Sequence, residues 1–227
     1  MRALENKQGR RLGGSVRLMT RISNCREKGS QVPSSDPNSK YTIRARAREK
    51  RASAFARFGE QIGPILTANF LAQFSYPSRV DMAGYWPMDE EADIRLLMTS
   101  LHRRGHRVAL PGDLRRGTPL RFFHWHPDDH LEAGYEGLLE PAAGNEEIHP
   151  EVLLVPLLSF DATGARLGYG GGFYDRTLAV LRKARKIVAV GVAYSDQEVD
   201  SLPVGDHDER LDWVVTELGC HRFGPPS

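Results

Sequence analysis

The chain of 227 residues is poor in cysteine. Its two cysteines, Cys25 and Cys220, lie near opposite ends, and neither belongs to a CxxC pair or to a zinc-binding spacing of cysteine and histidine. The sequence therefore argues against a disulfide framework and against a structural zinc site. This scarcity is typical of a reducing compartment, and we expect a cytoplasmic location.

Long hydrophobic runs are also lacking. No apolar stretch approaches the roughly 20 residues that a membrane span needs, so we expect no membrane partner. The sequence shows no convincing Ser/His/Asp or Cys/His constellation either, which argues against nucleophilic catalysis by a side chain. The apolar content of 40% and the charged content of 26% are ordinary for a soluble globular protein.

Positive charge is concentrated near the N-terminus. Residues 1–51 hold 14 Lys and Arg against 4 Asp and Glu, a net charge of +10, although the whole chain carries only +2. Residues 1–39 also have Gly, Ser and Pro clusters and little apolar periodicity, so we predict a disordered basic extension there. An upstream start or an organellar leader could explain it. Because it lacks aromatic residues and a recognisable module, we expect no nucleic-acid partner.

The most informative segment that is present runs from residue 152 to residue 176. An uncharged apolar run of strand length (152–158) is followed by a glycine-rich loop (168–172) and a helical pattern (173–185). Such an arrangement binds phosphate, because glycines let backbone N–H groups approach an anion and the helix directs its positive end at it. Arg166 and Arg176 bracket the loop with guanidinium groups suited to phosphate oxygens.

The loop differs from the two best-known phosphate loops. A Walker A loop requires Lys-Ser or Lys-Thr after its last glycine, where this chain has Phe173-Tyr174. The dinucleotide fingerprint requires a glycine at position 173. A plain glycine-rich turn stays an alternative, although so many Gly, Arg, Tyr and Asp residues would then be an unneeded cost in entropy and desolvation.

Strand and helix patterns alternate along the rest of the chain without repeats. Helices are predicted over 40–58, continuing to 74 with a break at Gly63-Pro64, and over 94–104. Strands are predicted at 79–86, 108–110, 120–125, 187–194 and 213–216, and a loop at 126–150. We therefore predict one α/β domain over 40–220, with a mainly parallel central sheet flanked by helices in three layers, and a tail over 221–227. Ligands of such sheets bind at the carboxyl ends of the strands.

Two clusters of charged or polar side chains have competing interpretations. Lys40, Arg44, Arg48 and Arg51 line one face of the first helix, as a solvated face or as a site for an acidic ligand that relieves their repulsion. A histidine and aspartate cluster follows the third strand, and a strand end running into a polar turn explains it more simply than a transition-metal site does. Its members are His124, His126, Asp128, Asp129 and His130.

Four motifs in order resemble those of the 5-formyltetrahydrofolate cyclo-ligase family, also called methenyltetrahydrofolate synthetases, over residues 40–218. The most specific is the run RLGYGGGFYD from Arg166 to Asp175, which is similar to the family's RLGxGxGYYD loop. The others are Lys40-x-x-x-Arg44, similar to a KxxxR that opens the family's first helix; Gly84-Tyr-Trp-Pro-Met88 with Glu91 and Asp93, where the family contacts folate; and Asp206-His-Asp208…Leu211-Asp212, which matches a metal-binding aspartate before the last strand.

The resemblance implies an ATP- and Mg²⁺-dependent cyclisation of 5-formyltetrahydrofolate to 5,10-methenyltetrahydrofolate, with release of ADP and phosphate. ATP would phosphorylate the formyl oxygen, and N10 would then attack the activated carbon. Such chemistry depends on positioning and charge neutralisation rather than on a protein nucleophile. The implied partner is a folate, with or without a polyglutamate tail, and we expect a monomer or a weak dimer.

The resemblance also implies roles by position. Arg166 and Tyr174 would be catalytic, and Asp175 and Asp212 would bind Mg²⁺. Nucleotide contacts would come from Lys40, Arg44, Arg166, Leu167, Gly168, Tyr169, Gly170, Gly171, Gly172, Phe173 and Tyr174, and folate contacts from Met88, Asp93, Tyr169 and Phe173. Alternatives stay open for three of these: Asp212 as a turn residue, Phe173 as a core residue and Asp93 as a helix N-cap.

Two other functions fit a scaffold of this kind. The first is a non-catalytic folate- or nucleotide-binding protein, although the retention of Arg166, Asp175 and Asp212 favours an enzyme. The second is a sugar-phosphate isomerase or acyl-CoA transferase, which needs a carboxylate acting on substrate carbon, and Glu91 is the candidate for that role. Similarity of fold does not decide between them.

Overall fold

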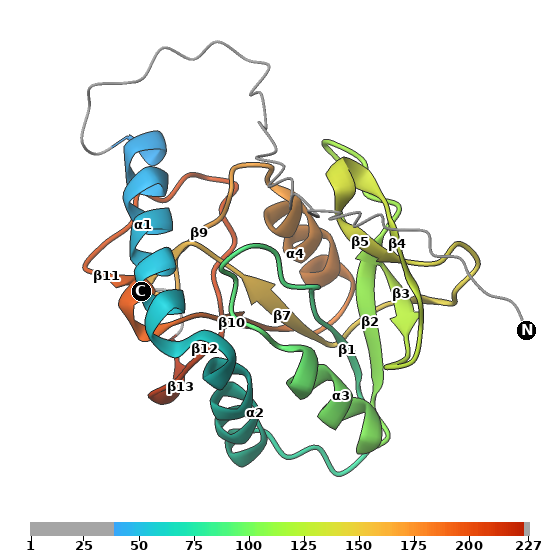
Figure 1. Cartoon of the computed structure of the whole chain (residues 1–227). Helices are drawn as coiled ribbons and strands as arrows, with labels where there is room; N and C mark the ends of the chain where they lie inside the picture. The colour runs from blue at the N-terminus through green and yellow to red at the C-terminus, as the bar shows by residue number, and fades with distance from the viewer. Residues whose placement is uncertain (1–38, 225–227) are drawn as a thin grey trace, which may run out of the picture. The chain divides into compact units, whose positions relative to one another are not determined.

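The computed structural model describes residues 39–224, and their centre is one eight-stranded sheet (Figure 1). The strand order is β13-β12-β10-β7-β1-β2-β3-β6. Five neighbouring strands run parallel: β12 (Trp213–Thr216), β10 (Val188–Val192), β7 (Val152–Pro156), β1 (Asp81–Ala83) and β2 (Arg107–Gly112). The outer strands β13 (Gly219–Arg222), β3 (Arg121–Trp125) and β6 (Glu147–Ile148) pair antiparallel. The predicted α/β architecture with a mainly parallel sheet is confirmed.

The central strand β7 shows why this sheet is covered on both faces. Val152 and Leu154 face a core that includes residues of α1 (Lys40–Phe58), α2 (Ile62–Gln73) and α3 (Arg95–Arg103). Leu153 and Val155 face a second core with α4 (Phe173–Ala184). Alternate side chains of a strand point to opposite faces, so an uncharged run with both sets apolar specifies helices on both sides.

The first helix begins and ends where the pattern predicts, at residues 40 and 58. Ser39 caps it, because its Oγ accepts a hydrogen bond from the Thr42 N–H at 3.2 Å. The predicted break at Gly63-Pro64 is wrong: the chain turns at Gly59, whose φ is 45°, and a 3₁₀ turn, η1 (Gly59–Gln61), leads into α2. Pro64 is tolerated in the first turn of α2, where a backbone N–H has no intrahelical partner.

Several short elements were not predicted. The segment predicted as a loop, 126–150, holds β4, η2, β5 and β6, and a small separate sheet forms around the glycine-rich region. These further elements are β4 (Leu131–Ala133), η2 (Tyr135–Gly137), β5 (Leu139–Pro141), β8 (Ser159–Asp161), β9 (Arg166–Leu167), η3 (Ser195–Gln197) and β11 (Glu198–Val199). The Pro111-Gly112 pair lies inside β2 instead of ending it. Strands of two or three residues are too short to show a periodic pattern, and some of them, such as β6 and β11, pair with segments distant in the sequence.

The predicted disordered extension and the end of the predicted tail lie at residues 1–38 and 225–227, outside the described residues. Within residues 39–224, no helix is long and apolar enough to cross a membrane.

Candidate functional site

The glycine-rich loop connects β9 to α4 and follows the antiparallel β8–β9 pair, which continues from the carboxyl end of β7. Gly170 and Gly172 have φ values of 107° and 65°, a region that residues with a Cβ rarely adopt. Gly172 is the N-cap of α4 and supplies no side-chain acceptor, so the helix begins without a side-chain cap. The loop therefore presents backbone N–H groups at the positive end of a helix.

One face of α1 packs against this loop. Arg44 Nε donates to the Gly168 carbonyl oxygen at 2.9 Å, and the Arg51 guanidinium donates to the Tyr169 hydroxyl. The Arg48 guanidinium lies 5.9 Å from the centre of the Tyr169 ring. The basic stripe of the first helix is thus directed at the glycine-rich loop, and is more than a solvated face.

A cationic cluster of Lys40, Arg44 and Arg166 gathers beside the loop. Arg166 pairs with Asp175 at 2.9 Å and also donates to the Glu209 carbonyl oxygen. Lys40 Nζ lies 2.6 Å from Asp208 Oδ2.

The pKa shifts of Asp208 and Arg44 indicate that the members of this cluster interact electrostatically. Burial opposes the charged form of Asp208, but hydrogen bonds from Lys40 and the Gly205 N–H, with the charge of Arg166, hold its pKa below the ordinary value. Burial and the nearby Arg48 lower the pKa of Arg44, while Asp208 acts in the opposite direction. Three cations and Asp208 therefore share one small region at the edge of the sheet.

Asp175 and Asp212, the pair expected to bind a metal, have different hydrogen-bond partners in the structure. Asp175 Oδ1 accepts from Arg166 and from the Glu209 N–H, at 2.9 and 3.1 Å. Asp212 Oδ2 instead accepts from the Ala189 N–H at 2.7 Å and from Arg182 at 3.0 Å, next to the start of β10. This placement fits the alternative that Asp212 is a structural residue before the last parallel strand.

Asp208 is the site residue that sequence reasoning missed. It belongs to the Asp206-His-Asp208 motif, so the motif was a signal, but the pattern alone did not say which carboxylate faces the cationic cluster. Across residues 39–224, no group of three or more His, Cys, Asp or Glu side chains is arranged to hold a metal ion, and this includes the histidine cluster after β3.

Arg51 lies between the glycine-rich loop and the segment expected to contact folate, which runs from Met88 to Asp93. The Met88 N–H donates to Glu91 Oε2 at 3.0 Å, and burial raises the pKa of the Glu91 carboxyl. Asp93 Oδ1 accepts from the Arg95 N–H at 2.9 Å and also pairs with that guanidinium, so it serves the start of α3. Arg51 lies 3.9 Å from Glu91 and 3.3 Å from Glu90, which joins this segment to α1.

The aromatic residues of the loop differ in exposure. Tyr169 is 39% exposed, whereas Phe173 and Tyr174 are partly buried against the core on the α4 side. Burial, together with the charge of Glu91, raises the pKa of Tyr174 far above its ordinary value. The Tyr174 hydroxyl is therefore a neutral hydrogen-bond donor near pH 7. Phe173 packs near Tyr135, with ring centres 6.2 Å apart, which fits the alternative of a core role.

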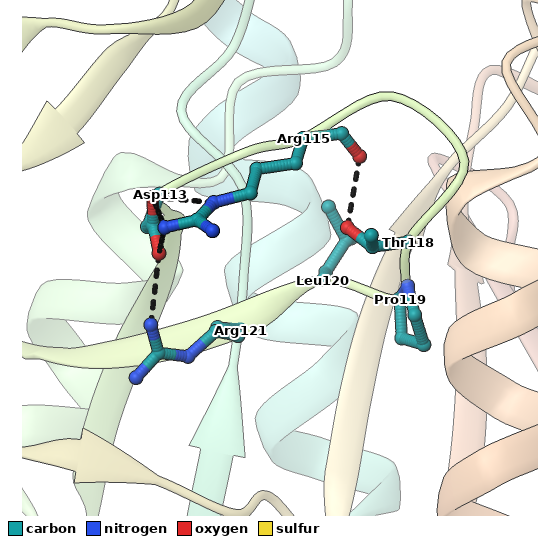
Figure 2. Close-up of a pocket in the computed structure, with 6 residues that line it drawn as sticks. All are labelled: Asp113, Arg115, Thr118, Pro119, Leu120 and Arg121. Atoms are coloured by element: carbon teal, nitrogen blue, oxygen red, sulfur yellow. Dashed lines mark hydrogen bonds and ion pairs between the residues drawn. The ribbon is translucent and has the colours of Figure 1, made fainter.

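A pocket of about 320 Å³ lies beyond Arg176, which donates to the Gly171 carbonyl oxygen at 2.6 Å and to that of Thr118 at 3.3 Å. Figure 2 shows that Arg115 and Arg121 in this pocket both point toward Asp113. Their charges are already paired, and none of the predicted site residues lines the pocket. Its full lining is Asp113, Arg115, Thr118, Pro119, Leu120 and Arg121.

A glycine-rich loop beside a cluster of cations, beyond the carboxyl end of a central parallel strand, is typical of the class of α/β proteins that bind phosphorylated ligands. Comparison with known proteins makes this specific. The model of the 5-formyltetrahydrofolate cyclo-ligase family matches residues 36–217. The chain therefore belongs to the 5-formyltetrahydrofolate cyclo-ligase family and is a ligase.

Individual relatives agree with this assignment. The chain is 33% identical to the 5-formyltetrahydrofolate cyclo-ligase of Haemophilus influenzae over 175 residues, 74% of this chain and 92% of the relative. It is 38% identical to that of Escherichia coli K12 over 141 residues, 60% of this chain and 76% of the relative. Among solved structures, the Aquifex aeolicus 5,10-methenyltetrahydrofolate synthetase superposes with a TM-score of 0.69 at 27% identity, covering 83% of this chain and 94% of the other.

Proposed function

We propose that the chain uses ATP and Mg²⁺ to cyclise 5-formyltetrahydrofolate to 5,10-methenyltetrahydrofolate, releasing ADP and phosphate. Family membership supports the cyclo-ligase reaction. The observation that carries the ATP dependence is the cluster of Lys40, Arg44 and Arg166 around Asp208, which Arg44 joins to the glycine-rich loop. We also expect this enzyme to work in the cytoplasm, as a monomer or a weak dimer.

The residues present fit a nucleoside triphosphate. Lys40, Arg44 and Arg166 would neutralise phosphate oxygens, and backbone N–H groups of the glycine-rich loop would bind the same oxygens. ATP supplies the phosphoryl group that turns the formyl oxygen into a leaving group. The contribution of these residues is to orient the phosphates and offset the negative charge that develops during transfer.

The site also fits a magnesium ion, with a different second carboxylate from the one expected. Mg²⁺ in phosphoryl-transfer sites takes one or two carboxylates and completes its shell with water and phosphate oxygens. We propose Asp175 and Asp208 for this role, because they pair with Arg166 and Lys40 of the cationic cluster, whereas Asp212 pairs with Arg182, which is not a member of that cluster. When bound, the ion supplies charge neutralisation between the phosphates.

Further residues would position the folate and keep water from the reacting atoms. Met88 and Tyr169 are accessible enough to touch a ring system, and we keep Phe173 and Asp93 as contacts of the same ligand. Tyr174, as a neutral phenol, would donate a hydrogen bond to an oxygen of the reacting group, and Arg166 would neutralise the charge beside it.

The direct test is to mix the full chain with 5-formyltetrahydrofolate and Mg-ATP and follow the near-ultraviolet absorbance of the methenyl product. We expect absorbance to rise with both nucleotide and metal present and to stay flat when either is omitted. Folate binding without product would instead favour the non-catalytic binding protein.

A further inference from the structure

We propose that Arg51 is a positioning residue that couples the glycine-rich loop to the Met88–Glu91 segment, so that nucleotide and folate bind cooperatively. This inference rests on the proposed function, because that function assigns the nucleotide phosphates to the backbone of the loop and the folate to Met88 and the Tyr169 ring.

Arg51 is a charged side chain in an unusual place. Its side chain is 2% exposed, and it lies on α1 between the loop and the segment. Its guanidinium donates to the Tyr169 hydroxyl and to Glu90 Oε2 at 3.3 Å, and lies 3.9 Å from Glu91 Oε1. It also lies 5.3 Å from the centre of the Tyr169 ring. One guanidinium thus joins three segments that are distant in sequence.

The cost of burial shows that this contact is not incidental. A buried ion loses several kcal/mol of hydration, and pairing repays that loss only when its geometry is good. The planar fork of arginine directs its donors outward in fixed directions, so it can hold two partners at once. A lysine at position 51 would supply the charge but could not hold Tyr169 and the glutamates in the same arrangement.

Two buried polar groups at and near Arg51 make no hydrogen bond within the described residues. Arg51 Nε and the Tyr194 hydroxyl are both buried, and neither has a hydrogen-bond partner within residues 39–224. Burial raises the pKa of Tyr194 to about 12, while the charge of Arg51 acts against that rise. A purely structural brace is expected to satisfy its buried donors. The unsatisfied groups leave Arg51 free to change its hydrogen bonds when the neighbouring segments bind a ligand.

The contacts form a continuous path between the two ligand regions. Tyr169 belongs to the loop and bonds to Arg51; Arg51 attracts Glu91; and Glu91 accepts the Met88 N–H. A ligand that fixes Tyr169 therefore fixes Arg51 and Glu91 as well. The second ligand then meets a segment whose ordering cost has already been met, which is positive coupling.

The test measures two affinities in the full chain: that of a non-hydrolysable Mg-ATP analogue with and without 5-formyltetrahydrofolate, and that of the folate with and without the analogue. We expect each ligand to tighten the other by the same factor, about 5-fold or more. Arg51→Met reduces this factor to about one, while each single-ligand affinity stays within about threefold. Arg51→Lys retains an intermediate factor. Arg46→Met removes an exposed arginine of the same helix and keeps the wild-type factor.

Tyr169→Phe is the second variant, in case Arg51→Met does not fold. It removes the hydroxyl that Arg51 bonds while keeping the ring, and it also lowers the factor. A coupling factor of one in the wild-type chain would overturn the inference. So would an unchanged coupling factor in both Tyr169→Phe and any folded Arg51 variant. In either case, turnover by the wild-type chain would still support the proposed function. Failure of the wild-type chain to bind either ligand overturns both.

Discussion

Two of the three cations of the proposed nucleotide site already have an anionic partner that a ligand must replace or share. Lys40 pairs with Asp208, and Arg166 pairs with Asp175. These pairs keep the like charges of the cluster together without a ligand, since they would otherwise repel one another. In the proposed function Asp175 and Asp208 would hold the metal ion, and Lys40 and Arg166 would then be available to phosphate oxygens.

Removal of Arg166 tests the cationic half of the site. We expect Arg166→Met to lower turnover by about 100-fold or more, because charge stabilisation by one directed donor contributes on this scale. The product absorbance measures turnover, and circular dichroism checks the fold. Arg115→Met, which removes an exposed arginine of the neighbouring pocket, serves as the matched control and should keep the wild-type rate. Equal rates in all three proteins would contradict the assignment.

The choice between Asp208 and Asp212 makes a second prediction. We expect Asp208→Asn to raise the Mg²⁺ concentration for half-maximal activity by about 10-fold or more, because one metal ligand is lost. Asp212→Asn should leave that concentration unchanged and lower the free energy of unfolding by about 1 kcal/mol, since it weakens the hydrogen bonds to Ala189 and Arg182. A magnesium titration and a urea titration separate the two effects. The reverse pattern would restore Asp212 as the metal ligand.

At the scale of elements, the sequence predicted the bounds of the first helix but not the conformations of the turns and loops. The pattern places α1 at residues 40–58, and the structure has it there, with Ser39 capping its start. The following break was misplaced, because Gly59 ends α1 in a left-handed conformation, while Pro64 is harmless in a first turn. Short strands such as β6 and β11 pair with segments distant in the sequence, so no local signal predicts them.

The candidate site was predicted to a similar degree. The sequence located the loop and the basic face of α1, because motif spacing records both. The resemblance pointed to Asp212 and not to Asp208, which lies four residues earlier, because the contacts of Asp212 with Arg182 and the Ala189 N–H are made with elements distant in sequence. The role of Arg51 was also hidden, because a charge stripe does not reveal which member is buried.

The backbone conformation of the glycine-rich loop, in which Gly170 has a positive φ, makes a further prediction. Gly170→Ala should weaken binding of the ATP analogue by about 10-fold, because a residue with a Cβ is strained by about 1–2 kcal/mol at a positive φ and would also press on Arg44, 3.3 Å away. Gly168→Ala is the matched control, since its φ is not positive and its Cβ would meet no atom within 4 Å. Calorimetric titration gives both affinities. Equal affinities in the two variants would mean that the loop conformation does not matter for binding.

At the scale of the molecule, the parallel sheet is tied together by charge as well as by its core. Asp81 on β1 and Arg107 on β2 are register partners, and Arg107 Nε donates to Asp81 Oδ1 at 2.7 Å. The hydrogen bond from Arg107 holds the pKa of Asp81 below its ordinary value, against the opposing effect of burial. The ionised carboxylate thus stabilises the folded chain at neutral pH.

The pH dependence of stability follows from this sign. Arg107→Met should lower the free energy of unfolding by about 1–2 kcal/mol at pH 7. Because the pKa of Asp81 is lower in the folded chain than in the unfolded chain, this difference is complete above pH ~4 and is lost as the pH falls through the folded value. Urea unfolding of both proteins at several pH values gives the difference. A difference that stays constant down to the most acidic folded condition would contradict the role of the Asp81 carboxylate.

The central claim is that one molecule of ATP is consumed for each folate ring that closes. The most direct measurement follows ADP and the methenyl product together, in the same reaction of the full chain with 5-formyltetrahydrofolate and Mg-ATP. The account predicts that the two products appear at equal rates and that neither appears when the folate is omitted. Methenyl product formed without ADP, or ADP released without methenyl product, would contradict it.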